Sequence, residues 1–495
     1  MRKRFEQQHE LGLKPISETR ILTKSRDNFP ALVASLVMIF TNESYNEQLF
    51  SILENKITKN KKATGRKGMD LWQIFVLAQT RLALNIDYDR LDVMANSNSI
   101  LRQLLGIERE STFEYKEISL QTIKDNVALL DDETLKQINV EIVKFAHDVF
   151  KKKEEEALSL KTDSFVVETN VHFPTDYNLL LDSARKSVDM IDAYVSKNKD
   201  IKGWRKSKDW RASLKNLSRA LGKASSTRGK YREKNIRISA NRYINKAKTL
   251  LLKLESSIKI FDIKDDKDLK ILIELEYFIM MLDKHIDLVE RRLIKGETIP
   301  HEEKLFSIFE TYTEWISKGK INKKVELGKR LSITSDQFGI ILDYHIHENI
   351  TDSEIVIDIA DRILSRYKVD TWSFDKGYWH KDNKELLKDE VRKLIMPKKG
   401  KPNKLEKAEE HEAEFVKFRK KHSAVESNIN ELEHRGLDRC PDRGHDAFKR
   451  YVGIGIGSYN LHRVGKELLR QQRIEQKRVA EELIAQQKSK DQIAA

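Results

Sequence analysis

The chain has 495 residues, of which 39% are hydrophobic and 34% are charged, and Cys440 is its single cysteine. This length allows two to four domains, while one cysteine excludes an intramolecular disulfide and any zinc site built from several cysteines. No stretch approaches 18 uncharged apolar residues and the chain starts with polar residues, so we expect neither a transmembrane span nor a secretory signal. These features favour a cytoplasmic protein in a reducing compartment.

The net charge of +14 is concentrated in one segment. Residues 197–253 contain 19 Lys or Arg and three Asp or Glu. Such a block is usually a solvated helical face, but Trp204, Trp210, Tyr231 and Tyr243 are interleaved with its cations. This composition favours contacts with nucleic-acid phosphates. The residues of the block that we expect to contact DNA are Arg205, Lys206, Arg211, Lys215, Arg228, Lys230 and Arg232.

Helical patterns dominate the first 155 residues. Residues 1–65 form a helical segment with a polar start. Asp70 is a suitable N-cap for a helix with an apolar face, and shorter helices follow as far as Gly106. Two further helices are predicted before residue 155. Residues 66–155 fit either a plain helical bundle or a domain that binds the ends of a DNA element.

Strand patterns begin after residue 156. Residues 157–168 are rich in β-branched and aromatic residues and predict a strand. A long helical stretch follows, and strand character returns after residue 320. The later predicted elements are a hairpin over 324–334 and 338–347, a helix over 352–367, short strands over 370–375 and 394–397, and a helix over 409–434.

This order of elements predicts a mixed α/β (α+β) fold, in which helices flank a mixed sheet and a long helical block is inserted into the sheet domain. The predicted divisions are an N-terminal helical segment (1–65), a helical domain (66–155), a catalytic core (156–196 and 305–440), a basic helical insertion (197–304) and a C-terminal helical tail (441–495).

Three carboxylates stand out within these elements. Asp163 lies in the first strand, Asp375 ends a later strand, and Glu426 lies on the long helix after it. Helical spacing places Arg419 and His422 on the same face as Glu426. Oxygen ligands suit Mg²⁺, and three carboxylates can bind two ions while leaving positions for a phosphate and a water. Taken singly, each carboxylate is more often a solvated or capping residue.

The segments around these carboxylates resemble those of bacterial insertion-sequence transposases of the ISNCY type, within the DDE superfamily. The similar segments are 162–176, 374–378, 422–426, 433–441 and 459–463, and they occur in the family's order. Two departures stand out. Many relatives carry a Tyr-Arg-Glu-Lys signature around the glutamate, whereas His422 lies here four residues before Glu426 and Glu433 seven residues after it. The helical insertion is also long and basic.

The resemblance implies an RNase H-like core with Asp163, Asp375 and Glu426 as catalytic ligands of two Mg²⁺ or Mn²⁺ ions. It also implies cleavage at transposon inverted-repeat ends and transfer of the 3′-hydroxyl ends into target DNA. The expected partners are double-stranded DNA and further copies of the chain, in a dimer or higher oligomer without a membrane. An RNase H-like nuclease without strand transfer and an inactive DNA-binding remnant are the alternatives.

Two smaller features complete the expectations. The basic loop with Lys398, Lys399 and Lys401 lies between Asp375 and Glu426, and we expect it, with Arg419 and His422, to contact DNA near the metals. The glycine-rich segment 453–458 lacks the spacing of a nucleotide-binding loop, which favours close packing of helices or a local turn.

Overall fold

The structure is a computed structural model that describes residue 4 and residues 12–59, 68–109, 116–198, 201–317 and 325–494, with only the backbone described beyond residue 485. The chain divides into two compact units. Unit 1 contains residues 1–170 and 316–495, and unit 2 contains residues 171–315. None of the described helices is long and apolar enough to cross a membrane.

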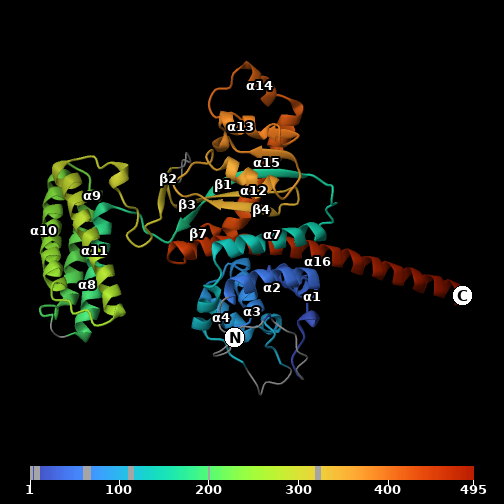
Figure 1. Ribbon diagram of the computed structural model, residues 1–495, viewed down its shortest axis with the longest axis horizontal. Helices are drawn as coiled ribbons and strands as arrows, with labels where there is room; N and C mark the ends of the chain where they lie inside the picture. Colours follow the sequence, from blue (N-terminus) through green and yellow to red (C-terminus); the bar gives the residue numbers. More distant parts are fainter. Residues whose placement is uncertain are drawn as a thin grey trace. The chain divides into compact units, whose positions relative to one another are not determined.

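Unit 1 contains a seven-stranded mixed sheet (Figure 1). Its central strand β1 pairs antiparallel with β3 on one side and parallel with β5 on the other. The strands are β1 (Leu158–Thr169), β2 (Glu314–Ser317), β3 (Val325–Ser335), β4 (Ile341–Ile346), β5 (Val369–Phe374), β6 (Lys393–Ile395) and β7 (Arg439–Cys440). The order is β2-β3-β1-β5-β6, with β4 also pairing with β3 and β7 with β1. The mixed sheet and its hairpin thus follow the prediction.

Helices before the sheet pack into the same unit. They are α1 (Phe29–Thr41), α2 (Glu43–Ile57), α3 (Leu71–Ala83), α4 (Tyr88–Ser97), α5 (Ser99–Leu104), α6 (Leu120–Val127) and α7 (Asp132–Val149). The α3 helix begins with the predicted cap, because the Asp70 side chain and Gln73 form a capping box. Every residue of α3 is buried, so this helix is core of the unit.

The segment predicted as a C-terminal tail is a central helix of unit 1. Helix α16 (His445–Ala494) lies beside α1, α3 and α7 (Figure 1). The glycine-rich segment 453–458 is inside this helix, and a Cβ at Gly455 would lie 2.9 Å from Leu437. The expectation of close helix packing is therefore confirmed. Only the helix beyond about residue 472 is fully exposed, within the part whose side chains are described.

Helices of unit 1 also follow the individual strands. They are α12 (Val356–Leu364), α13 (Lys381–Leu387), α14 (Lys404–Glu410) and α15 (Ala413–Leu432). The α15 helix packs on β1, β5 and β6. Its buried residues include Val425, Asn428 and Leu432, and Asn428 Nδ2 donates to Ser335 Oγ of β3 at 3.0 Å. These contacts fix one face of α15 on the sheet.

Unit 2 is a helical bundle around its own apolar core. Its long helices are α8 (Asp176–Lys197), α9 (Ser207–Ser226), α10 (Arg232–Ile258) and α11 (Asp266–Glu290). Neighbours in sequence pack together, and α11 closes the ring on α8. We assigned residues 176–196 to the sheet domain, but Leu180, Val188 and Ile191 of α8 are buried in the bundle core. The insertion therefore starts near residue 171 rather than 197.

Candidate active site

Strand register brings Asp163 and Asp375 next to each other. The last pair between parallel strands β1 and β5 is Thr162 with Phe374, and the two aspartates are the next residues of their chains. Neighbouring strands lie about 4.8 Å apart. Two residues that are 212 positions apart in the sequence therefore become adjacent, at the carboxyl end of β5.

Asp163 is largely buried, and this changes its acidity. Burial raises the pKa of its carboxyl group to about 7, although the hydrogen bond from Ser164 N to Asp163 Oδ1, of 2.7 Å, acts in the opposite direction. The negative charges of Asp375, Asp352 and Glu426 raise the pKa further. Each of these three carboxylates therefore lies close enough to Asp163 to repel its charge.

Asp375 differs from Asp163 because it is exposed. It ends β5 and caps a short 3-10 turn, η4 (Lys376–Tyr378). Its Oδ2 accepts a long hydrogen bond of 3.5 Å from Gly377 N. An exposed carboxylate at the end of a parallel strand is in the position where ligands commonly bind to such sheets.

Glu426 lies on α15, the helix that packs on β1 and β5. One turn before it, His422 Nδ1 lies 2.9 Å from Ser373 Oγ of β5, which anchors this part of the helix. Ser373 lies two residues before Asp375 and therefore on the same face of the sheet. Glu426 is exposed, and its charge acts on Asp163. Asp375 and Glu426 therefore both lie close enough to Asp163 for their charges to act on it.

His422 is a mostly buried, neutral side chain. Burial lowers its pKa to about 4, an effect opposed by the charge of Asp375. Its Nε2 is buried and has no hydrogen-bond partner among the described residues. The imidazole is therefore neutral near pH 7, and it offers no positive charge to a DNA phosphate.

The donor set suits a hard divalent cation, because all the converging groups are carboxylate oxygens. Within the described ranges, however, no three acidic, His or Cys side chains are near enough to hold an ion. Asp375 and Glu426 are exposed, so their side chains can rotate toward Asp163. A buried oxygen of Asp352 that lacks a hydrogen-bond partner among the described residues, together with the raised pKa of Asp163, supports a place for a cation here. The residues therefore fit the expected ion.

Asp352 is the residue that we did not predict. It begins a predicted helix, where an aspartate is ordinarily an N-cap. In the structure it lies in the loop between β4 and α12. Its charge acts on Asp163, so it belongs to the acidic group. No spacing in the sequence relates Asp352 to Asp375, because the two residues come from different loops.

The predicted DNA-contact residues of the basic block lie in unit 2, and most are exposed. Exposed positions are Arg205, Lys206, Lys215, Arg228, Lys230 and Arg232. Arg211 is instead half-buried and forms ion pairs with Asp189 at 2.5 Å and Asp192 at 2.7 Å. Its charge is balanced within the bundle, so Arg211 is a poor candidate for binding phosphate.

The interleaved aromatic residues do not form the nucleic-acid surface that we expected. Trp204 and Tyr243 are buried in the bundle core, and Trp204 Nε1 donates to Ser257 Oγ at 2.9 Å. Lys246 Nζ lies 3.9 Å from the ring centroid of Trp210, a cation–π contact inside the bundle. Tyr231 alone of the four is fully exposed. The aromatic residues therefore stabilise the bundle.

The basic loop between Asp375 and Glu426 is partly neutralised. Lys398 Nζ lies 2.7 Å from Glu406 and 5.0 Å from the ring centroid of Trp379. Lys399 and Lys401 are exposed. Arg419 is exposed on α15, with Glu410 at 3.8 Å. Of the DNA contacts predicted in this loop and on α15, Lys399, Lys401 and Arg419 are thus the exposed cations.

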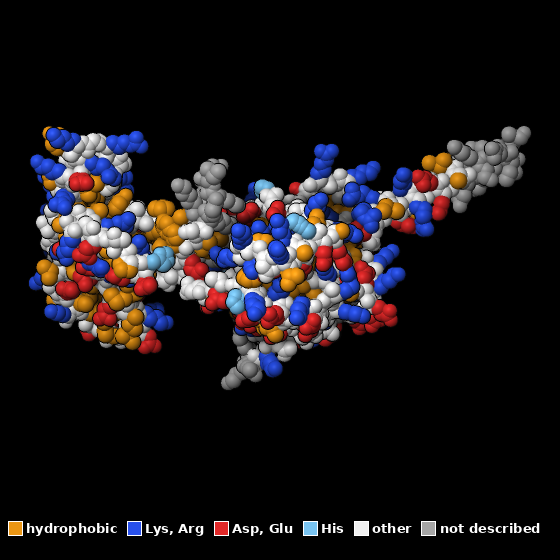
Figure 2. All heavy atoms as spheres, turned by 90° about the horizontal axis from the view of Figure 1, so that it is seen from above, with side chains coloured by type: hydrophobic (Ala, Val, Ile, Leu, Met, Phe, Trp, Pro, Cys, Tyr) orange, Lys and Arg blue, Asp and Glu red, His pale blue; other side chains and the backbone are white. Residues whose placement is uncertain are grey.

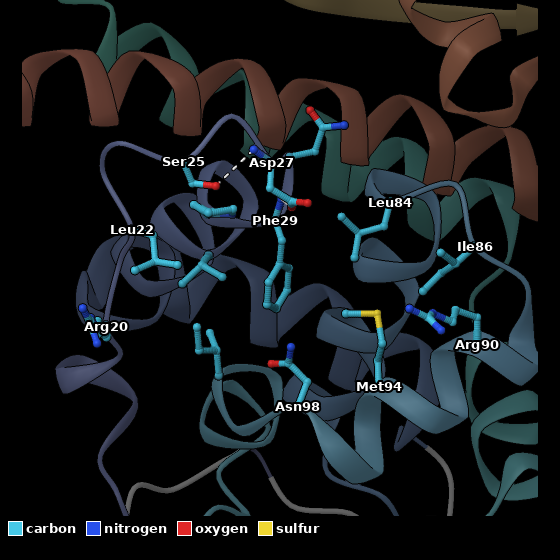
Figure 3. A pocket seen from close by; sticks show the side chains of 14 residues that line it. Arg20, Leu22, Ser25, Asp27, Phe29, Leu84, Ile86, Arg90, Met94 and Asn98 are labelled. Atoms are coloured by element: carbon cyan, nitrogen blue, oxygen red, sulfur yellow. Dashed lines mark hydrogen bonds between the residues drawn. The ribbon is translucent and has the colours of Figure 1, made fainter.

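A cavity of about 450 Å³ lies among the N-terminal helices (Figure 3). Its lining residues all lie between Arg20 and Ile100, far in the sequence from the predicted carboxylates. Phe29, Leu84 and Met94 point into it, and Arg20 and Arg90 lie at its sides. The lining contains one acidic residue, Asp27, and neither cysteine nor histidine. This cavity therefore contains no group of side chains for catalysis.

Comparison with protein families identifies one domain. Residues 292–461 match the transposase DDE domain family, a range that includes Asp352, Asp375 and Glu426 but not Asp163. No curated protein and no solved structure gives a significant match to the chain. The domain includes the strands and helices that carry two of the three predicted carboxylates. About a third of the chain is therefore similar to the transposase DDE domain family.

Proposed function

We propose that the protein binds the ends of its transposon, cleaves DNA phosphodiesters there and joins the freed 3′-hydroxyl ends to target DNA. The observation that supports this most directly is the convergence of Asp163, Asp375 and Glu426 beside a mixed sheet. A hairpin on one side of β1 and parallel strands on the other also support an RNase H-like core.

The three carboxylates would hold the divalent ions. Bound there, such a pair of ions activates the attacking oxygen and stabilises the leaving one. The position of the Asp163 carboxylate is fixed by its strand and by the hydrogen bond from Ser164 N, so we expect it to be the rigid ligand of the site. Asp375 and Glu426 are exposed and stand where a DNA phosphate can approach. Their side chains therefore close the site around the substrate.

The charge of unit 2 supports a role in holding DNA. Helices α9 and α10 carry twelve Lys or Arg and three acidic residues, whereas α8 and α11 carry six Lys or Arg and eleven acidic residues. Because α9 and α10 are neighbours, the bundle has one basic side. Figure 2 shows clusters of Lys and Arg on the visible surface of the bundle. We propose that this side contacts DNA phosphates without reading the sequence.

A strand-transfer assay tests the proposed function. The full chain is incubated with Mg²⁺, a supercoiled plasmid, and linear DNA that ends in the inverted repeats flanking the gene. We expect nicked or cut ends and joined plasmid products from the wild type. Asp375→Asn should bind the ends normally and give neither product. Cleavage by Asp375→Asn at the wild-type rate would contradict the assignment of the carboxylates.

The same assay separates the two alternatives. Pre-cut ends with a free 3′-hydroxyl need no cleavage step, so a transposase joins them to the plasmid and a simple nuclease does not. A protein that binds the ends but yields no metal-dependent product from either substrate is an inactive remnant. The family match favours the transposase, because the matched domain retains both Asp375 and Glu426.

A further inference from the structure

Asp352 is held in place by an arginine on the neighbouring hairpin. Its side chain is 14% exposed, and its Oδ2 accepts a hydrogen bond of 3.0 Å from Arg330 Nη1 of β3. The other oxygen, Oδ1, is buried and has no hydrogen-bond partner among the described residues, while His347 Nε2 is 3.8 Å away. A buried carboxylate oxygen without a partner is costly, and native proteins retain such groups mostly where they serve a function.

The same carboxylate lies against the turn that follows Asp375. A Cβ added to Gly377 would lie 2.8 Å from Asp352 Oδ2, closer than side chains approach in folded proteins. The φ angle of Gly377 is not positive, so Asp352, and not the backbone, is what excludes a side chain there. The turn and the Asp352 loop therefore fit together closely.

A second contact joins these two loops. Asn383 Nδ2 lies 2.7 Å from Ser353 O and 3.4 Å from Tyr378 O, and thus bridges the residues after Asp352 and the end of the turn. The hydroxyl of Tyr378 lies 2.5 Å from Ser332 Oγ of β3. The turn is thereby supported on both sides. Among the described residues, the long hydrogen bond from Gly377 N is the one that orients the Asp375 carboxylate.

We propose that Asp352, anchored by Arg330, is a positioning residue that holds the Asp375–Tyr378 turn and so directs the Asp375 carboxylate toward Asp163. The inference rests on the proposed function, since it concerns the same carboxylates. Asp352 acts through packing against Gly377, and it need not contact the cation or the DNA. Residues that orient metal ligands from behind commonly change metal affinity 10- to 100-fold when they are replaced.

Binding of Mn²⁺ to the full chain, measured by calorimetry without DNA, tests the role of Asp352. Asp352→Ala and Gly377→Ala should each weaken Mn²⁺ binding by roughly tenfold or more. The double variant is the sharper test, because the added Cβ of Gly377→Ala acts through its collision with Asp352. In the Asp352→Ala background, Gly377→Ala should therefore cause almost no further loss.

Asp343→Ala is the matched control. Asp343 lies on β4, is also mostly buried, and pairs with Arg362 at 2.7 Å, so its loss removes a similar ion pair outside the acidic group. We expect this variant to lose stability and to keep its Mn²⁺ affinity. Asp352→Asn, which keeps the volume but loses the charge paired with Arg330, replaces Asp352→Ala if the latter does not fold. It should weaken Mn²⁺ binding in the same direction.

The outcomes separate this inference from the proposed function. Wild-type Mn²⁺ affinity in the Asp352 variants, or losses that multiply in the double variant, would overturn the positioning role alone. Wild-type affinity in Asp375→Asn would overturn the metal site itself, whatever the Asp352 variants do. Loss of affinity in Asp343→Ala equal to that in Asp352→Ala would show a general effect of stability, and would also overturn the positioning role.

Discussion

Asp163 and Asp375 are the next residues after the last paired positions, Thr162 and Phe374, of two adjacent parallel strands. Asp163 is mostly buried, while Asp375 is exposed. The sheet therefore holds one rigid and one accessible carboxylate side by side. Their repulsion contributes to the pKa of about 7 at Asp163, together with its burial.

The raised pKa of Asp163 predicts how stability depends on pH without metal. In the unfolded chain this carboxyl group titrates near pH 4, whereas in the folded chain it titrates near pH 7. The folded state therefore binds the proton more tightly, and the stabilising contribution is fully present below about pH 4 and lost as the pH rises through about 7. In EDTA, the wild type should lose more stability than Asp163→Asn between pH 5 and pH 8.

Thermal unfolding of both proteins in matched buffers measures this difference. Other groups also titrate in this range. The test is therefore the difference in stability between the two proteins at each pH, and not the pH dependence of either protein alone. If the stability of the wild type and that of Asp163→Asn changed equally with pH, the raised pKa of Asp163 would be contradicted.

Divalent cations should stabilise the protein, and more strongly at higher pH. A cation competes with the proton on Asp163, so its affinity rises as this group ionises near pH 7. At a concentration 100-fold above Kd, binding adds about 2.7 kcal/mol to the free energy of unfolding. The increase in Tm with Mn²⁺ should be larger at pH 8 than at pH 6, and it should vanish in Asp163→Asn. An equal increase at both pH values would argue for binding elsewhere.

The basic side of the bundle should contribute nonspecific, salt-sensitive affinity for DNA. Lys215 and Arg219 are exposed on α9, and Lys267 and Lys270 are exposed on the acidic side, on α11. Replacing the α9 pair by Ala should lower the slope of log K against log salt by about 2, since each phosphate contact contributes about 0.9. The α11 pair is the matched control and should leave the slope unchanged. Equal changes of the slope for the two pairs would show that DNA contact is not confined to the basic side of the bundle.

Arg211 illustrates why this surface could not be predicted residue by residue. Composition indicates a basic block, but it does not tell which cations are paired with Asp189 and Asp192 of the helix before it. Trp204, in the segment before α9, and Tyr243, on the buried side of α10, likewise belong to the bundle core, although charged residues surround both in the sequence. Amphipathic helices mix both kinds of residue in sequence, and only the folded bundle separates them.

The mixed sheet and the places of Asp163 and Asp375 on two of its strands were more predictable, for a physical reason. Strands with β-branched and aromatic residues are visible in the sequence, and an aspartate at the end of such a strand has a defined place. Asp352 has no such signal, because its relation to Gly377 arises where two loops from different strands meet. The central position of α16 was also missed, since its charged second half concealed a buried first half.

Gly465 gives a direct test of that central position. A Cβ at Gly465 would lie 1.7 Å from Ala31 O, so Gly465→Ala must push α16 away from α1. Alanine favours an isolated helix by about 1 kcal/mol over glycine, but overpacking of this kind costs about 1–3 kcal/mol or more. Gly222 of α9 is the matched control, because its Cβ would meet only ordinary contacts, at 3.7 Å from the Tyr177 hydroxyl. Chemical denaturation should show that Gly465→Ala destabilises unit 1 while Gly222→Ala leaves unit 2 equally or more stable. Stabilisation by Gly465→Ala would mean that α16 does not pack against α1 as described.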